Sequence, residues 1–311
     1  MTKKTSTAAI VIGIFIIISG CLFAAGQSLD IPSKKWGISF GNSKEFSGLR
    51  FNFRDSQVKR ITGINVTLWQ PHKDNKEAII TGVSLGAIPG GGTLRGLQIG
   101  ILGVAAEDSL TGVSLGLLGM GAGENITGIN IGGLGAGCGN NLKGLNLGGL
   151  GVGAGENVTG ITIGGIGAGA GKNMMGLNIG GIGVGAGERM AGINIAGIGA
   201  GSGKELTGVT IAGVAAGSTR VRGIVVGGFA VGGQDLKGLF VAGGCVHVTI
   251  NGQMTGIAVS PFNYFKGSQS GISIGIVNYA FRVKGVQIGL VNIVRSNPKY
   301  LRILPLFNSS F

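Results

Sequence analysis

The feature that most constrains the fold of this chain is an internal repeat of sixteen residues. The segment Ile126–Cys138 is followed by the closely similar Leu142–Ala154, and the same order of residue types continues beyond it. Looser copies, spaced by 14 to 19 residues, extend the array upstream to Gly48 and downstream to Gly285. Such a period is typical of folds that stack one structural unit. The glycines that mark the constant spacing are Gly112, Gly128, Gly144, Gly160, Gly176, Gly192 and Gly208.

The composition excludes most other classes of protein. With 67 glycines in 311 residues, a helical bundle is excluded, because each glycine inside a helix costs about 1 kcal/mol relative to alanine. Only 6 prolines are present, which excludes collagen. A hydrophobic content of 44% and a mean hydropathy of +0.45 exclude a disordered chain. The sequence therefore predicts an all-β protein.

The net charge of +13 does not by itself indicate a nucleic-acid partner. It results from a shortage of acidic residues, 12 in all, rather than from an excess of basic ones. The 25 lysines and arginines are scattered, and no nucleic-acid-binding motif accompanies them. We expect no nucleic-acid partner.

Within one repeat the residues alternate with a period of two, which is typical of a β-strand. Ile129 and Ile131 point to one side of that strand and Asn130 to the other. The alternation changes at the pair Gly132-Gly133, which predicts a corner. In the central array the charged residues occupy only the opposite end of each repeat, which predicts an exposed turn there. These residues are Glu124, Lys143, Glu156, Lys172, Glu188, Arg189, Lys204 and Glu205.

This pattern favours a glycine-rich β-solenoid of about sixteen coils, in which short strands stack in parallel. Two apolar rows are expected to face each other in its core. One row is Ile129, Leu145, Ile161, Leu177, Ile193 and Val209, and the other is Leu134, Leu150, Ile166, Ile182, Ile198 and Val214. A row of amide and hydroxyl side chains, hydrogen-bonded from coil to coil, is expected along one face of the solenoid. Its members are Asn130, Asn146, Thr162, Asn178, Asn194 and Thr210.

The alternative architecture is an up-and-down transmembrane β-barrel, in which each repeat is one long strand. The stretch 129–138 would cross an apolar band of about 25 Å when tilted. The terminal Phe311 also resembles the last residue of an outer-membrane barrel. Aromatic residues make up only 6% of the chain, however, which is few for the aromatic girdles of such barrels. Every strand would also need a bulge at the same depth.

The N-terminus is typical of an export signal. Lys3 and Lys4 precede an apolar run at residues 8–25. Three interpretations remain open: lipidation of Cys21, which follows a lipobox-like Ile-Ser-Gly; ordinary cleavage after Gly26; or retention of the run as a membrane anchor. All three place the rest of the chain outside the cytoplasm.

The predicted division of the chain follows from this signal. Residues 1–26 form the signal, and 27–311 form a single repetitive β domain that is most regular at 107–218.

The units near the C-terminus carry a family resemblance. They contain Gly271-Ile-Ser-Ile-Gly-Ile-Val-Asn278 and Gly285-Val-Gln-Ile-Gly-Leu-Val-Asn292, and Gly63-Ile-Asn-Val-Thr-Leu-Trp69 lies near the start. Together with Trp36-Gly-Ile-Ser-Phe-Gly41 and the closing Leu304–Phe311, they resemble bacterial surface-repeat proteins with GLQIGLVN-type repeats, first described in spirochaetes. The resemblance runs from about residue 36 to the end, but the central Gly-Gly-rich units depart from the QIGLVN form. It implies an exported, surface-associated protein and supplies no catalytic residues.

No group of residues predicts catalysis, a metal site or a cofactor. His72 lies in a polar loop and His247 on a strand, and neither has a partner at a useful spacing. Glycine-rich matches to nucleotide-binding motifs arise from the repeat itself, and they lack the required residues around Lys172 and Lys204. Cys138 and Cys245 are expected to be free and buried.

The sequence thus predicts an exported bacterial surface protein with a structural or adhesive role. The largest interruptions of the array, at 69–78 and 260–270, predict exposed partner contacts at Phe262, Tyr264, Phe265 and Lys266. Expected partners are the membrane, through a lipid anchor or association with the envelope, an unknown surface ligand, and further copies through the flat sheet faces. A barrel channel is the alternative function, and an enzyme is the third.

Overall fold

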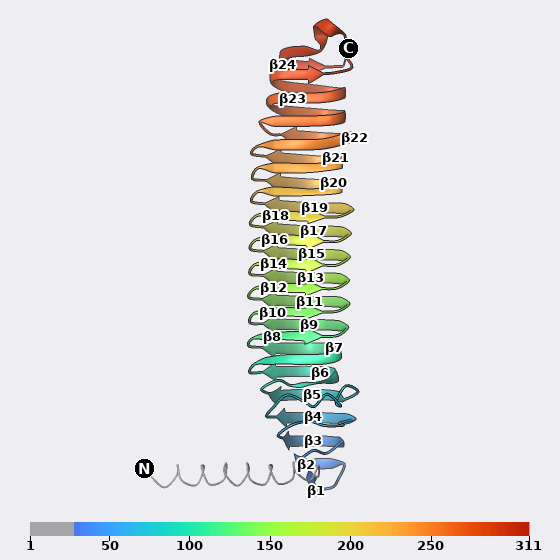
Figure 1. The fold of residues 1–311 in the computed structure, drawn as a ribbon, viewed down its shortest axis with the longest axis vertical. Coiled ribbons are helices and arrows are strands. Elements are labelled where there is room, and N and C mark those ends of the chain that lie inside the picture. Colours follow the sequence, from blue (N-terminus) through green and yellow to red (C-terminus); the bar gives the residue numbers. More distant parts are fainter. Residues whose placement is uncertain (1–27, 311) are drawn as a thin grey trace, which may run out of the picture. The chain divides into compact units, whose positions relative to one another are not determined.

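The computed structural model describes residues 28–310, which are almost entirely β-strand (Figure 1). Two compact units divide the chain, at 1–149 and 150–311. Among the described residues, no helix has both the length and the apolar character needed to cross a membrane.

Unit 1 contains the first eleven strands among its described residues. They are β1 (Ser28–Pro32), β2 (Trp36–Gly41), β3 (Glu45–Asn52), β4 (Arg60–Thr67), β5 (Ile79–Gly86), β6 (Gly90–Gly100), β7 (Gly103–Gly116), β8 (Gly119–Ala122), β9 (Asn125–Gly132), β10 (Gly135–Cys138) and β11 (Asn141–Gly148).

Unit 2 contains the remaining strands and one short 3₁₀ helix. They are β12 (Gly151–Ala154), β13 (Asn157–Gly164), β14 (Gly167–Ala170), β15 (Asn173–Gly180), β16 (Gly183–Ala186), β17 (Arg189–Ala196), β18 (Gly199–Ser202), β19 (Glu205–Ala212), β20 (Ala215–Gly227), β21 (Ala230–Ala242), β22 (Cys245–Val259), β23 (Phe262–Val294), η1 (Lys299–Leu301) and β24 (Ile303–Ser309).

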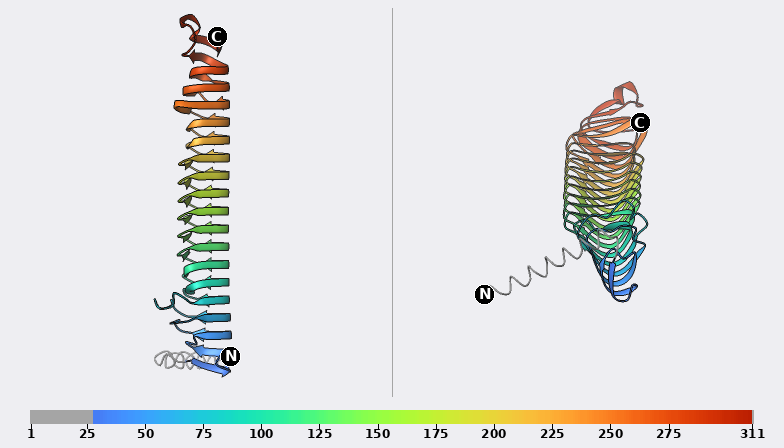
Figure 2. Two further views of the ribbon diagram at one scale, coloured as in Figure 1. Left: turned by 90° about the vertical axis from the view of Figure 1, so that its right-hand side faces the viewer. Right: turned by 60° about the horizontal axis from the view of Figure 1, so that its bottom comes forward.

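Both units are β-solenoids, as predicted. Each strand pairs in parallel with the equivalent strand one coil later, and in the central repeats every residue pairs with the residue sixteen positions on (Figure 2). Antiparallel pairing occurs between β1 and β2 in unit 1 and between β23 and β24 in unit 2. The transmembrane barrel is therefore wrong, because an up-and-down barrel requires antiparallel neighbours throughout.

The glycine that marks each repeat is required by the backbone. Every such glycine from Gly37 to Gly285 has a φ between +105° and +144°, a region that other L-residues rarely adopt. A Cβ added to Gly176 would also overlap the carbonyl oxygen of Gly160 in the coil before. The constant spacing found in the sequence thus marks the point of closest approach between successive coils.

The predicted corner at the Gly-Gly pair is confirmed. One coil of unit 1 consists of β9, a bend at 133–134, the short strand β10 and a second bend at 139–140. The charged ends of the repeats lie at or next to the second kind of bend, as predicted, and they are exposed or half-buried there. Glu156 and Lys172 are paired across neighbouring coils.

The predicted apolar core is wrong, because the side chains that were expected to point into the core point outward. Ile129 and Ile161 are each 43% exposed, and Leu145, Leu177 and Val209 are half-buried. The second expected row, from Leu134 to Val214, lies at the bends and is 45–52% exposed. The side chains that fill the coils are instead Ile126, Leu142, Val158, Met174, Met190 and Leu206, together with small residues on the short strands such as Ala136, Val152 and Val184.

The row of amides and hydroxyls lies inside the solenoid instead of along its surface. Its six members, from Asn130 to Thr210, have no exposed area. Asn130 donates a hydrogen bond to Asn146 over 2.9 Å, and Asn178 donates to Asn194 over 2.9 Å. Stacking in register lets each amide find its partner one coil away, which offsets the cost of burial. In β20, β21 and β22 the same inward column continues with the apolar residues Val225, Phe240 and Ala258.

The repeat glycines and the outward glycines should differ sharply in their tolerance of alanine. We expect Gly176→Ala to lower the free energy of unfolding by at least about 2 kcal/mol, because the backbone conformation and the close carbonyl both exclude a Cβ. In Gly169→Ala the new Cβ would lie 3.7 Å from the carbonyl oxygen of Gly185. That variant should stay within about 0.5 kcal/mol of the parent. Urea unfolding of both variants measures the difference, and equal stabilities would contradict it.

The buried row predicts opposite effects for the same substitution at two of its positions. Asn194→Val should destabilise the chain by about 1–3 kcal/mol, since it leaves the buried amide of Asn178 without its acceptor. The Thr162 hydroxyl has no hydrogen-bond partner among the described residues. Thr162→Val should therefore leave stability unchanged or raise it, with nearly the same side-chain shape. Thermal unfolding followed by circular dichroism compares the two, and a larger loss in Thr162→Val would refute the assignment.

Candidate interaction surfaces

The most extensive unpartnered surface of unit 2 is an apolar face formed by two columns of outward side chains. The columns follow the repeat glycine on each coil and lie on either side of one buried residue, which is polar in most coils and is Val225, Phe240 or Ala258 in three of them. All sixteen members are Ile, Leu or Val: Ile161, Leu177, Ile193, Val209, Ile224, Leu239, Ile257 and Ile272 in one column, and Ile163, Ile179, Ile195, Ile211, Val226, Val241, Val259 and Ile274 in the other. We call this the apolar face of unit 2.

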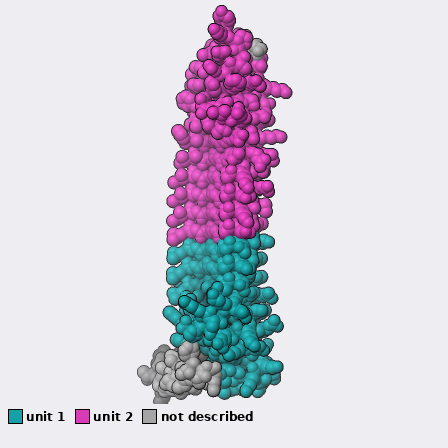
Figure 3. Space-filling model, turned by 45° about the vertical axis from the view of Figure 1, so that its right-hand side comes forward, with its two compact units in different colours: residues 1–149 teal, residues 150–311 magenta. Residues whose placement is uncertain are grey.

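A third column at the bends adds to this face. Its backbone groups are hydrogen-bonded from coil to coil, and its members are Leu150, Ile166, Ile182, Ile198, Val214 and Phe229. They are 45–62% exposed. In space-filling view the side chains on the visible face of unit 2 lie in rows that repeat coil by coil (Figure 3). Contiguous exposed apolar patches larger than a few hundred Å² are rare on ordinary monomers and mark interaction sites.

Unit 1 carries the same two outward columns. Every member is apolar: Ile38, Leu49, Ile64, Val83, Leu97, Val113, Ile129 and Leu145, and Phe40, Phe51, Val66, Leu85, Ile99, Leu115, Ile131 and Leu147. The inward residues between them are all polar and buried: Ser39, Arg50, Asn65, Ser84, Gln98, Ser114, Asn130 and Asn146. Polar-in and apolar-out is the reverse of a strand in a soluble sandwich.

The short strands of unit 2 present a different, nearly bare outer face. Gly167 and Gly169 of β14 point outward between buried alanines, and β16 repeats the arrangement with Gly183 and Gly185. A Cβ at any of these positions would meet its nearest atom at 3.4–3.7 Å, so the backbone does not require glycine there. The flat glycine surface expected from the sequence is confirmed for these strands.

The charged turns of unit 2 form short ion-pair ladders. Glu156 pairs with Lys172, and Lys204 Nζ lies 2.9 Å from a carboxylate oxygen of Glu188. The hydrogen bond and charge of Glu156 raise the pKa of Lys172, and those of Lys204 lower the pKa of Glu188. These exposed pairs link neighbouring coils and contribute little to stability individually.

The predicted contact residues are only partly exposed. Phe262 and Tyr264 are 55% and 42% exposed, and Lys266 is exposed beside them. Phe265 is completely buried, so its assignment as a contact residue is wrong: it points inward in register with Val248.

The interruption predicted at 260–270 is also wrong. Residues 262–294 form the continuous strand β23, and the register shift lies earlier, between Val248 and Gln253. The interruption at 69–78 does correspond to a loop, between β4 and β5, and His72 lies in it.

Two residues of the surface around Tyr264, His247 and Tyr279, were not predicted as contact residues from the sequence. The ring centroid of His247 lies 5.8 Å from that of Tyr264, and Tyr279 continues the row at 5.0 Å. Lys266 Nζ lies 5.5 Å from the centroid of the Tyr264 ring. Burial, and then the charge of Lys266, lower the pKa of His247. The spacing of 15 residues between Tyr264 and Tyr279 was the available signal, because it matches the local length of a coil.

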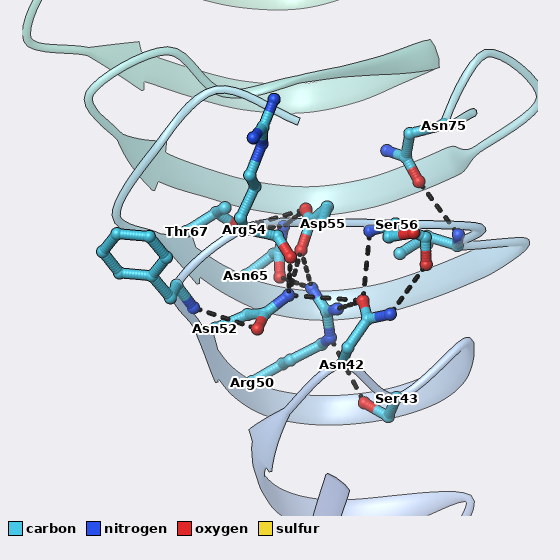
Figure 4. Close-up of polar contacts among 12 residues, drawn as sticks. Asn42, Ser43, Arg50, Asn52, Arg54, Asp55, Ser56, Asn65, Thr67 and Asn75 are labelled. Atoms are coloured by element: carbon cyan, nitrogen blue, oxygen red, sulfur yellow. Dashed lines mark hydrogen bonds and ion pairs between the residues drawn. The ribbon is translucent and has the colours of Figure 1, made fainter. Parts of the chain in front are cut away.

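The densest polar cluster surrounds Arg50, within the buried row of unit 1 (Figure 4). Arg50 Nη1 lies 2.6 Å from a carboxylate oxygen of Asp55, and the two side chains are 0% and 1% exposed. Asn52, Asn65 and Thr67 also donate hydrogen bonds to the carboxylate of Asp55. A substrate cannot reach groups that are buried and paired to this extent, so the cluster is structural.

Within 28–310 no group of three or more His, Cys, Asp and Glu side chains is placed to hold a metal ion. Cys138 and Cys245 are free, as predicted, but both are half-buried instead of buried. Burial raises the pKa of the Cys138 thiol. The predicted lipidation site, Cys21, lies outside the described residues.

Comparison with protein families, with curated proteins and with solved structures finds no match to this chain.

The Arg50–Asp55 pair predicts a specific dependence of stability on pH. Burial alone would raise the pKa of Asp55, but the charge of Arg50 and the hydrogen bonds from Asn52, Arg50 and Asn65 outweigh it and hold the pKa below its usual value. The pair therefore stabilises the fold fully above the unfolded-state pKa of about 3.9 and loses this contribution as the pH falls through the lower folded pKa.

Removal of one charge should expose this contribution. Asp55→Asn leaves Arg50 buried without its counter-ion and should cost about 3–5 kcal/mol at pH 7. The difference from the parent chain should shrink below about pH 4. Urea unfolding of both proteins between about pH 2.5 and pH 7, in steps of about 0.5 pH unit, tests this. A difference that does not depend on pH would show that the charge of Asp55 is unimportant.

Proposed function

We propose that this chain is an exported, non-catalytic structural protein of the bacterial cell surface, whose apolar faces join copies of the chain side by side. The observation that carries the proposal is the apolar face of unit 2. The fold does not need these side chains, because the coils are filled by other residues. Aliphatic residues at all sixteen positions therefore point to a surface that is covered when the protein acts.

A second copy of this chain fits that face better than other partners. Rows of Ile, Leu and Val at the spacing of a sheet are suited to pack against another sheet of the same spacing, about 10 Å away. An isologous contact uses the same patch on both copies, so one face supplies both sides of the interface. A stable interface needs about 800 Å² from each partner, which is within reach of a face that spans eight coils. A membrane-surface face would instead carry Lys, Arg and Trp around its apolar strip.

The proposed location comes from the N-terminal sequence and from the resemblance to bacterial surface-repeat proteins. The basic and apolar order at residues 1–26 supports export, and Cys21 supports a lipid anchor on the membrane. An anchored and laterally assembled solenoid would form a repetitive layer or fibre, and it would present any binding site many times.

Cysteine crosslinking in intact cells tests this assembly. Cysteine is placed in turn at Ile166, Ile182 and Ile198 on the apolar face, and at Met175 and Thr207 on the outward positions that precede the repeat glycine. All five side chains are exposed. Mild oxidation should give disulfide-linked dimers from at least one position on the apolar face and none from the two controls.

The background for this experiment removes the native thiols. Cys138→Ala and Cys245→Ala are combined, and the chain without an added cysteine measures any contribution from Cys21. A matched pair strengthens the test: Ile182→Lys should reduce the yield of dimers from the Ile198→Cys variant, while Thr207→Lys should not. Dimers in equal yield from the apolar-face positions and the two control positions, or from neither set, would refute assembly through the apolar face.

A further inference from the structure

The C-terminal part of unit 2 differs in charge from the rest of the array. Residues 236–311 contain seven basic residues and no acidic one, whereas 107–218 contain six acidic and four basic residues. The basic residues are Lys237, Lys266, Arg282, Lys284, Arg295, Lys299 and Arg302. A region with one sign of charge attracts and concentrates anionic partners.

The ring row of His247, Tyr264 and Tyr279 lies on this basic part. Strand register places His247 beside Tyr264, in the column that Gly232 occupies one coil earlier. The bare glycine column therefore gives way to rings where the positive charge begins. The rings point outward, because the residues on either side of Tyr279, Asn278 and Ala280, are buried.

A basic hollow adjoins the ring row around the edge of the coil. It measures about 450 Å³ and is lined by Gln253, Ser268, Ser270, Arg282, Lys284 and Ser296, among others. Along β23, Tyr279 is followed by outward Phe281, and the guanidinium of Arg282 lies 5.9 Å from the Phe281 ring. The ring row and the hollow therefore both include residues of β23, and each of them also includes residues of neighbouring coils.

The chemistry of this surface favours one class of ligand. Arg282 and Lys284 suit carboxylate or sulfate groups, whereas serine hydroxyls and the amide of Gln253 suit the hydroxyls of a sugar. The arrangement spans several coils, which fits a linear polymer. Nucleic-acid bases need open ring faces for stacking, but His247 and Tyr264 are stacked on each other at an interplanar angle of 27°.

We propose that the basic surface of β22 and β23 binds an anionic polysaccharide, with its acidic groups at Arg282 and Lys284 and its sugar units along His247, Tyr264 and Tyr279. The site is separate from the apolar face, and the inference does not depend on the proposed assembly. Loss of polysaccharide binding would leave the crosslinking result unchanged, and absence of crosslinks would leave this binding intact.

Binding of the full chain to immobilised polygalacturonate and heparin tests the proposal. The protein is purified in a non-ionic detergent and measured at low salt. The double variant Arg282→Gln/Lys284→Gln should bind about tenfold more weakly or worse, because both cations at the hollow are removed. Arg95→Gln/Lys143→Gln makes the same change in net charge at exposed positions of unit 1 and should stay within about twofold. Tyr264→Ala should weaken binding without any change in charge.

Three outcomes would overturn the proposal. Equal losses in the two double variants would show that binding follows net charge alone. Equal binding to neutral dextran would show that the acidic groups are not recognised. Tighter binding to single-stranded oligothymidylate, or to vesicles containing phosphatidylglycerol, than to either polysaccharide at the same salt would assign the surface to a different class of partner. Circular dichroism of each variant confirms that the solenoid is retained.

Discussion

The contact on which the rest of this structure depends is the close approach of successive coils at the repeat glycine. At that point the backbone adopts a positive φ, and a Cβ would overlap a carbonyl oxygen of the coil before. The residue must be glycine on every coil, and its spacing sets the length of the coil. Because all other side chains keep a fixed offset from this glycine, one local requirement generates the columns that run along each unit.

This constraint also explains which parts of the fold could be predicted from the sequence. The period, the parallel stacking and the bend at Gly132-Gly133 follow from the repeat, because a change of one residue within a strand would turn its side chains to the other face. Coils of other lengths, such as the 15 residues from Gly208 to Gly223, keep the columns in register because the change falls outside the strand that carries the repeat glycine. The inside and the outside could not be predicted in the same way. Alternation shows that Ile129 and Asn130 point in opposite directions, but it does not show which of them faces the core. The usual preference for apolar interiors then predicted the wrong face of each strand as the inner one.

The inward position between the two outward columns is filled in different ways along the chain. In the central repeats it holds an amide or a hydroxyl beside one large side chain such as Met174. From β20 to β22 it holds the apolar residues Val225, Phe240 and Ala258 instead. An amide fits because its partner is supplied by the next coil at hydrogen-bond distance. In unit 1 the same position holds Arg50, whose charge is matched by Asp55. The buried row therefore accepts different polar groups, and a neighbouring coil or turn completes the hydrogen bonds of most of them, although not that of the Thr162 hydroxyl among the described residues.

The residues of the candidate surfaces could also be predicted only in part from the sequence. The sequence indicated Phe262, Tyr264 and Lys266 as contacts but also Phe265, because a break in the pattern removes the information on parity. The structure shows which of these side chains point outward. It also adds His247 and Tyr279, which are far from Tyr264 in sequence but lie next to it on the neighbouring coils.

The columns of the solenoid divide into those whose residues the fold requires and those whose residues it does not require. Positions that the backbone or the core requires are occupied by glycine, by buried apolar residues such as Leu142 and Met174, or by buried amides. The two outward columns after the repeat glycine are apolar in both units, and they are aliphatic at all sixteen positions of unit 2. A separate outward column changes from glycine to rings where the charge becomes basic. Variation among structurally free positions would be expected if nothing contacted them. Their regularity is therefore the strongest physical argument that this solenoid acts through its outer faces.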